Sequence, residues 1–130
     1  MILADTSVWI DFLRGTRSQA ADELDRRLAE HSVLMCGPVA TELLTGIEAR
    51  ERIRLWETLS AMAWADIARA DWYMAGDLRA ELRDRGVQVS LPDVLIAAAA
   101  ATRATLWTRD RHFEQIAEVL EPLEVRLFEG

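Results

Sequence analysis

The chain has 130 residues, 51% of them hydrophobic, and a net charge of −7, which favours one globular domain and excludes a disordered chain. The acidic balance also argues against a simple basic nucleic-acid-binding module, although not against a nuclease that holds phosphates through bound cations. All fifteen basic residues are Arg, so mechanisms that need a lysine, such as Walker-type phosphate loops and Schiff-base chemistry, are excluded.

The first predicted element is a short buried strand at residues 2–4, which stops at Asp5. Apolar residues at helical spacing follow it, and Ser7 is a suitable residue to cap that helix. An acid at the carboxyl end of an interior strand lies where α/β sheets place their ligands. Capping of the next helix is the other explanation for Asp5, and both remain open for this residue alone.

The remaining elements follow in a regular alternation. In chain order we expect a helix capped by Ser18, a strand at 33–36, a helix opened by Pro38 and ending near Gly46, a helix at 48–59, a strand at 62–65, a helix from a cap at Asp66 to Arg85 closed by Gly86, a helix from Ser90 and Pro92 to about Arg103, a strand at 105–108, a helix at 113–119 and a strand at 125–128.

Alternating strands and helices indicate an α/β fold with a mostly parallel sheet flanked by helices. No repeat or linker divides the chain, so residues 1–130 are predicted to form a single domain. The lone Cys36 lies in an apolar run and is predicted to be a core thiol, which fits a cytoplasmic protein. No leader peptide and no membrane-spanning segment is expected.

Four acids come just beyond predicted strands or early in the helices that follow them: Asp5, Glu42, Asp93 and Asp110. Carboxylate oxygens are the ligands that Mg²⁺ and Mn²⁺ prefer, and such ions activate water and stabilise displacement at phosphorus. Each acid alone also has an ordinary explanation as a helix-end, turn or solvated residue. Their joint placement predicts a carboxylate cluster at one edge of the sheet.

The segments around these acids resemble the four acidic motifs of PIN-domain ribonucleases. The segments are Asp-Thr-Ser-Val-Trp-Ile-Asp-Phe-Leu from Asp5, Pro-Val-Ala-Thr-Glu-Leu-Leu-Thr-Gly around Glu42, Leu-Pro-Asp-Val-Leu-Ile-Ala-Ala around Asp93 and Leu-Trp-Thr-Arg-Asp-Arg-His-Phe around Asp110. They occur in order over essentially the whole chain. Within that family the chain looks most like the VapC toxins of toxin–antitoxin pairs.

The resemblance implies a three-layer α/β/α sandwich with four or five strands, and endonucleolytic cleavage of RNA that depends on Mg²⁺ or Mn²⁺. By motif, Asp5, Glu42, Asp93 and Asp110 take the places of the catalytic and metal-binding acids, with one or two ions. Thr6, Ser7 and Thr108 match hydroxyl positions near the metals, and capping or strand-end roles are the alternative for each. The resemblance also implies a homodimer, and inhibition by a VapB-type antitoxin whose C-terminal segment lies across the active site.

Other residues were weighed for a role in binding or catalysis. Arg14, Arg109 and Arg111 flank two of the acidic motifs and are candidates for RNA phosphate contacts, although solvated surface positions explain them equally simply. His31 and His112 have no partners at metal-ligand spacing and are expected on the surface. Trp9 and Trp107 are expected to pack in the core.

Three alternatives remain open. Aspartate-phosphorylating domains also begin with a strand that ends in an acid, but a receiver domain would need a Lys, and a haloacid-dehalogenase-like phosphatase would need an acid where Ser7 stands. The second alternative is a stand-alone PIN nuclease outside a toxin–antitoxin pair, and the third is a PIN scaffold used only for binding. The intact set of four acids argues against the scaffold.

Overall fold

The computed structural model describes residues 1–129, whose five strands form one parallel sheet in the order β3-β2-β1-β4-β5. The strands are β1 (Ile2–Ala4), β2 (Val33–Met35), β3 (Ala63–Trp64), β4 (Thr105–Thr108) and β5 (Val125–Leu127). The predicted parallel sheet of four or five strands is therefore confirmed. Because β1 lies at the centre, between β2 and β4, the residue that follows it emerges in the middle of one sheet edge.

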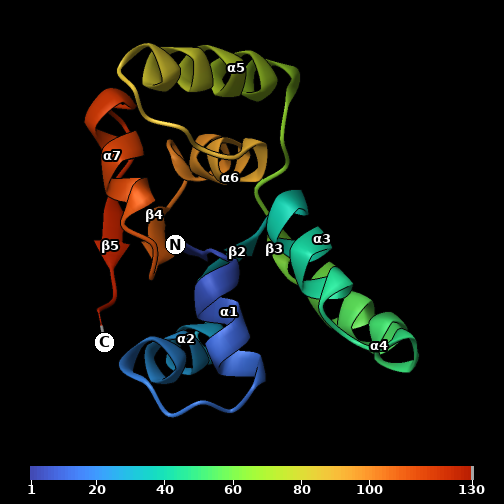
Figure 1. Cartoon of the computed structure of the whole chain (residues 1–130). Coiled ribbons are helices and arrows are strands. Elements are labelled where there is room, and N and C mark those ends of the chain that lie inside the picture. Colours follow the sequence, from blue (N-terminus) through green and yellow to red (C-terminus); the bar gives the residue numbers. More distant parts are fainter. Residues whose placement is uncertain (130) are drawn as a thin grey trace.

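Helices cover both faces of this sheet. They are α1 (Thr6–Leu13), α2 (Gln19–Ala29), α3 (Gly37–Thr45), α4 (Ala49–Ser60), α5 (Arg69–Asp84), α6 (Leu91–Ala100) and α7 (His112–Val119). Figure 1 shows α1 and α2 on one side of the sheet and α5 stacked on α6 on the other, which gives the predicted α/β/α layers. None of the helices between residues 1 and 129 has the length and apolar character needed to cross a bilayer.

The central strand is apolar along its whole length, and the helix that packs behind the site is apolar from Val94 onward. All three residues of β1 are buried, and seven of the ten residues of α6, Val94 through Ala100, are buried as well. A strand covered on both faces needs such a continuous apolar run, because neither face meets water. This packing holds the ends of β1 and α6, and therefore the residues placed there, in fixed positions.

The N-terminal caps of α2 and α6 and the C-terminal end of α5 agree with the sequence. Ser18 and Ser90 each accept a backbone N–H three residues ahead, and Gly86 ends α5 with a φ of 82°. A φ in this region favours glycine because a side chain would be strained there. Trp9, Trp107 and Cys36 are buried, as predicted. Burial raises the pKa of the Cys36 thiol to about 11, so it stays protonated at neutral pH.

Several predicted boundaries are wrong, and among them α6 ends at Ala100 rather than near Arg103, and β3 spans only Ala63–Trp64. The cap of α1 is Asp5, not Ser7, because the Asp5 carboxylate accepts the Val8 N–H. Cys36 lies outside β2 and is the N-cap residue of α3. The cap of α5 is Ala68, not Asp66, because residue 65 still pairs with β2 through the Met35 carbonyl and keeps the chain extended.

Candidate active site at the carboxyl edge of the sheet

The topology carries the four predicted acids to one edge of the sheet. Asp5 directly follows β1, Asp110 follows β4 by two residues, Glu42 lies in the second turn of α3 after β2, and Asp93 lies in the first turn of α6. Parallel strands end at a common edge, so these elements deliver their acids to the same side of the molecule. Asp110 and Glu42 are near enough for their negative charges to raise the pKa of Asp93.

Asp5 is the most enclosed of the four acids. It is only 4% exposed, and its Oδ1 accepts hydrogen bonds from the Ser7 hydroxyl at 2.6 Å and from the Val8 backbone N–H at 3.2 Å. Its Oδ2 accepts a short hydrogen bond from the Thr108 hydroxyl. Burial raises the pKa of Asp5, and these hydrogen bonds offset part of that rise because they favour the ionised form. The carboxylate is therefore held in one orientation by donors on both of its oxygens.

Thr108 links the Asp5 carboxylate to the backbone of Asp110. This residue is fully buried, donates its hydroxyl to Asp5 and accepts the Asp110 backbone N–H at 2.9 Å. Ser7 completes the connection, since its oxygen accepts the Arg109 backbone N–H at 3.1 Å. The two hydroxyl residues thereby fix the loop after β4 to the start of α1. Both were predicted to lie near the acids, and the structure places them in contact with Asp5.

Glu42 lies on the exposed side of the same edge. Its Oε1 accepts the Thr6 hydroxyl at 2.6 Å, so the third predicted hydroxyl residue also contacts a carboxylate. Glu42 is exposed and borders an apolar groove of about 450 Å³ whose walls include Trp64, Trp72 and Leu91. Trp72 is 54% and Leu91 46% exposed. An acid beside exposed apolar side chains is accessible to a large partner as well as to solvent.

Asp93 opens α6 beside the Ser90 cap. Its backbone N–H donates to the Ser90 oxygen at 3.2 Å. Burial raises the pKa of Asp93 most, and the Asp110 and Glu42 carboxylates raise it further; the Ser90 hydrogen bond and His112 lower it. The ionised form of Asp93 is therefore disfavoured by its neighbours, and a bound cation would relieve that repulsion.

The histidine next to Asp110 is a site residue that the sequence reasoning missed. His112 is exposed, as predicted, but its Nδ1 lies 2.9 Å from Asp110 Oδ1, and its backbone N–H donates to the same oxygen at 2.9 Å. The spacing of two residues between an acid and a histidine at a helix start was the available signal. The contact orients the Asp110 carboxylate toward α7.

The predicted phosphate-binding arginines have other partners. Arg109 pairs with Asp11 of α1, and Arg111 pairs with Glu129, while the exposed Arg14 forms the C-cap of α1. Asp11 was not among the predicted residues, because it lies inside a helix with an ordinary apolar pattern. Its pairing with Arg109 anchors the loop after β4 from a second side.

The donors at this edge suit a hard divalent cation. They are carboxylate oxygens, the ligands preferred by Mg²⁺ and Mn²⁺, and their mutual repulsion is visible in the raised pKa of Asp93. Within residues 1–129, no three His, Cys, Asp or Glu side chains lie close enough together to hold a metal ion as they stand. Binding would therefore depend on movement of the more exposed carboxylates, Glu42 and Asp110, because Asp5 is held in place by its hydrogen bonds.

Comparisons with known proteins agree with this architecture. The model of the PIN domain family matches residues 2–119. VapC ribonuclease Mb1587 of Mycobacterium bovis is 34% identical over 125 residues, which cover 92% of this chain and 93% of that protein, and Ribonuclease VapC11 of Mycobacterium tuberculosis matches to the same extent.

Solved structures of similar fold include two toxin–antitoxin complexes. A chain of VapBC2 from Rickettsia felis, crystallised with a DNA fragment from the promoter, has a TM-score of 0.75 at 20% identity and covers 98% of this chain and 99% of that chain. A chain of VapBC-1 from nontypeable Haemophilus influenzae has a TM-score of 0.75 at 19% identity, with 98% of each chain covered. At this level of identity the likeness supports the fold.

Proposed function

This chain belongs to the PIN-domain family, and we propose that it is a metal-dependent endoribonuclease that acts as the toxin of a VapBC-type pair. The observation that carries the proposal is the position of Asp5, Glu42, Asp93 and Asp110 along one sheet edge, where burial and then the Asp110 and Glu42 charges raise the pKa of Asp93. Its relatives named as VapC ribonucleases support RNA as the substrate. The proposal places the protein in the cytoplasm, where RNA is available.

The four acids are the proposed holders of one or two Mg²⁺ or Mn²⁺ ions. When bound, such ions supply an activated water and neutralise charge on the phosphate that is cleaved. Asp5 contributes the fixed carboxylate, since both of its oxygens accept hydrogen bonds that keep it oriented. Thr108 and Ser7 position Asp5, and His112 positions Asp110, while Glu42 and Asp93 approach from α3 and α6.

A VapB-type antitoxin is the proposed protein partner, and a homodimer the proposed assembly. Support for the antitoxin comes from relatives of the same fold that were crystallised as VapBC complexes. The apolar groove beside Glu42, with its exposed Trp72 and Leu91, is a suitable surface for a partner segment that would cover the acids. An Arg from such a segment would be attracted by the carboxylates.

The test is expression of the wild-type chain and of Asp5→Asn in bacteria, combined with cleavage of RNA by the purified proteins. Asn keeps the size of Asp5 and can still accept the Val8 N–H, so the fold is retained while the charge is lost. We expect growth arrest and Mg²⁺- or Mn²⁺-dependent cleavage from the wild type, and a loss of cleavage on the order of 100-fold or more in the variant. The exposed Asp25→Asn on α2 is the matched control and should behave as the wild type.

The possible outcomes separate the alternatives. Equal toxicity of wild type and Asp5→Asn, or cleavage that persists in a chelator, would contradict the proposed site. Absence of cleavage by a folded wild type with either metal would favour a PIN scaffold used only for binding. If the wild type cleaves RNA, but no DNA-binding protein encoded beside it restores growth when it is co-expressed, a stand-alone nuclease would be favoured.

A further inference from the structure

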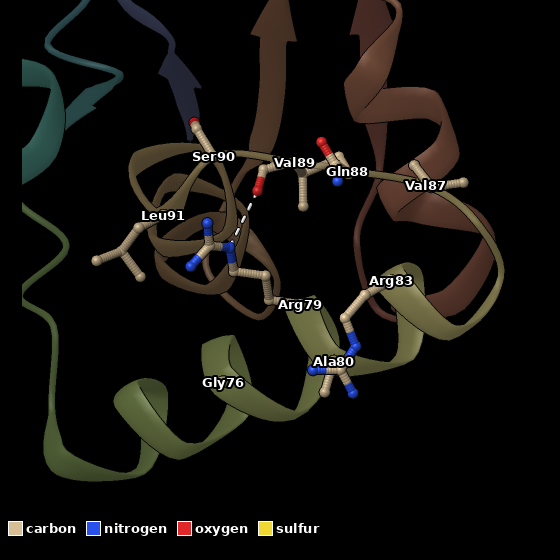
Figure 2. Close-up of a pocket in the computed structure, with 9 residues that line it drawn as sticks. All are labelled: Gly76, Arg79, Ala80, Arg83, Val87, Gln88, Val89, Ser90 and Leu91. Carbon is tan, nitrogen blue, oxygen red and sulfur yellow. Dashed lines mark hydrogen bonds between the residues drawn. The ribbon is translucent and has the colours of Figure 1, made fainter.

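A second cavity lies on the other side of the start of α6. It has a volume of about 750 Å³, is open to solvent, and lies between α5 and residues 87–91. Figure 2 shows Arg79 reaching from α5 to this segment, where its Nε donates to the Val89 carbonyl at 3.0 Å. Arg83 lies one turn further along α5 and also lines the cavity.

The cavity is positively charged in a protein that is acidic overall. Within residues 1–129, Arg79 donates to a neutral carbonyl and forms no ion pair with a carboxylate, so its positive charge is not neutralised. Arg83 pairs with its neighbour Asp84 at 3.1 Å, and both side chains are about 70% exposed, so this pair is weak and exchangeable. Two arginines four residues apart on one helix face present guanidinium groups to the same cavity.

This position is next to the acidic edge. The cavity wall includes Ser90 and Leu91, and the Ser90 oxygen accepts the N–H of Asp93. The cavity and the acidic edge therefore share the first turn of α6, whose N-terminus favours an anion. A polynucleotide that reached Asp93 would carry a neighbouring phosphate over this cavity.

We propose that the cavity lined by Arg79 and Arg83 binds a backbone phosphate of single-stranded RNA, about one or two nucleotides from the bond at the acidic edge. The inference rests on the proposed function and names a part of the chain that holds its substrate. A protein of net charge −7 needs local cations to hold a polyanion. Of the arginines expected from the sequence, Arg109 is held in a partly buried pair with Asp11, and Arg111 pairs with Glu129 on the surface; neither lines this cavity.

An acidic peptide would meet the same arginines, but the cavity fits a nucleotide backbone better. Its wall, as formed by the described residues, has two arginines and no aromatic side chain, whereas a peptide segment gains most of its affinity from large, often aromatic, anchors. Those anchors are offered instead by the groove on the Trp72 side of Leu91. The cavity offers charge and backbone groups, which are the contacts that phosphate takes.

The test measures binding of a fluorescein-labelled single-stranded RNA of mixed sequence to the Asp5→Asn protein, with and without Arg83→Gln. In the part of the chain that the structure describes, the polar contacts of the Arg83 side chain are with Asp84 alone, so its removal leaves the fold intact. We expect the dissociation constant to rise about 3- to 10-fold, and the slope of log affinity against log salt to fall by about 0.7, which is the release expected for one phosphate of a single strand. Arg79→Gln combined with Arg83→Gln should weaken binding further.

Arg54→Gln, which removes one exposed arginine from α4, is the control of equal charge and should change binding less than twofold, that is, by less than about 0.4 kcal/mol. In the background with Asp5 restored, Arg83→Gln should raise KM for RNA and leave kcat nearly unchanged. If RNA binding and its salt slope are the same with and without Arg83, the proposal is overturned. Weakened binding of an acidic peptide with unchanged RNA binding would overturn it as well.

These outcomes are distinguishable from failure of the proposed function. If the wild type does not cleave RNA at all, the binding measurement still reports whether the cavity takes a phosphate. If the wild type cleaves RNA and Arg83→Gln changes neither KM nor affinity, the enzyme assignment stands and the cavity assignment fails.

Discussion

Asp5 and Glu42 lie at the same sheet edge, and each accepts a hydroxyl hydrogen bond at 2.6 Å, yet their surroundings differ. Asp5 is 4% exposed and accepts from two side chains and a backbone amide, whereas Glu42 is exposed and accepts from Thr6 on the molecular surface. We call Asp5, Ser7 and Thr108 the buried half of the site, and Glu42, Asp110 and His112 its exposed half.

The difference shows how such a site divides two tasks. The buried half is fixed by β1, β4 and the core behind them, so it can set the position of one carboxylate without a metal present. The exposed half is open to solvent, where we propose that substrate, ions and a partner protein arrive, and its side chains have room to move. We expect changes in the buried half to affect both stability and activity, and changes in the exposed half to affect activity alone.

Thr108→Val is the strongest way to test this contrast after the loss of Asp5 itself. Valine has nearly the shape of threonine, but it removes the donor to Asp5 and the acceptor of the Asp110 N–H in a fully buried place. We expect cleavage to fall about 10- to 100-fold, as for other residues that orient metal ligands, and unfolding free energy to fall by about 1–3 kcal/mol. RNA cleavage rates and urea denaturation measure the two effects.

Thr105→Val at the other end of β4 is the control for that variant. Thr105 lies in the same strand but has no role in the acidic edge, so cleavage should stay at the wild-type level. If Thr108→Val cleaved RNA as fast as Thr105→Val, the buried half would have no part in positioning Asp5.

The predictable parts of this molecule are those fixed by local chemistry. Ser18, Ser90 and Gly86 act on backbone groups within a few residues, so their roles could be inferred from sequence spacing. The position of the four acids at one sheet edge could also be predicted from the sequence, because the carboxyl ends of parallel strands lie at the same edge.

The prediction was wrong, or missed a contact, where residues far apart in the sequence determine the local structure. The start of α5 depends on a hydrogen bond between residue 65 and Met35, which keeps Asp66 out of the helix and gives the capping contact to Asp71. The pairing of Asp11 with Arg109 joins α1 to the loop after β4, and neither residue type nor spacing signals it. Such contacts become visible only when the sheet order is known.

The pH dependence of metal binding tests the charge balance of the whole edge. The pKa of Asp5 and that of Asp93 are both raised in the folded protein. In the metal-free protein, the protonated forms of these two acids therefore contribute stability that is fully present below the unfolded pKa of about 3.8. This stability is lost as the pH rises through the raised folded pKa values. A divalent cation binds the ionised carboxylates and offsets that loss. We expect Mg²⁺ to raise Tm most at about pH 7.5, and progressively less as protons compete toward about pH 4.

Thermal unfolding with and without millimolar Mg²⁺ measures this effect. At a metal concentration of 100 times Kd the gain would be about 2.7 kcal/mol, a shift of several degrees for a chain of this size. Asp5→Asn should reduce the gain at every pH. A metal-induced rise in Tm that was equal across the range would show that the ion binds away from these carboxylates.

Thr6→Val is the smallest expected change, and it sharpens the comparison from the exposed half. It removes the same kind of hydroxyl contact as Thr108→Val, from a carboxylate of the same edge, but water can replace the lost donor. We expect unfolding free energy to change by less than about 0.5 kcal/mol and cleavage to fall by less than about fivefold.

Thr102→Val, which changes an exposed threonine just after α6, is the matched control. A double-mutant cycle with Glu42→Gln should give a coupling below about 1 kcal/mol, because both side chains are solvated. A loss as large as that of Thr108→Val would mean that Glu42, despite its exposure, is held as firmly as Asp5, and the division between the two halves would have to be abandoned.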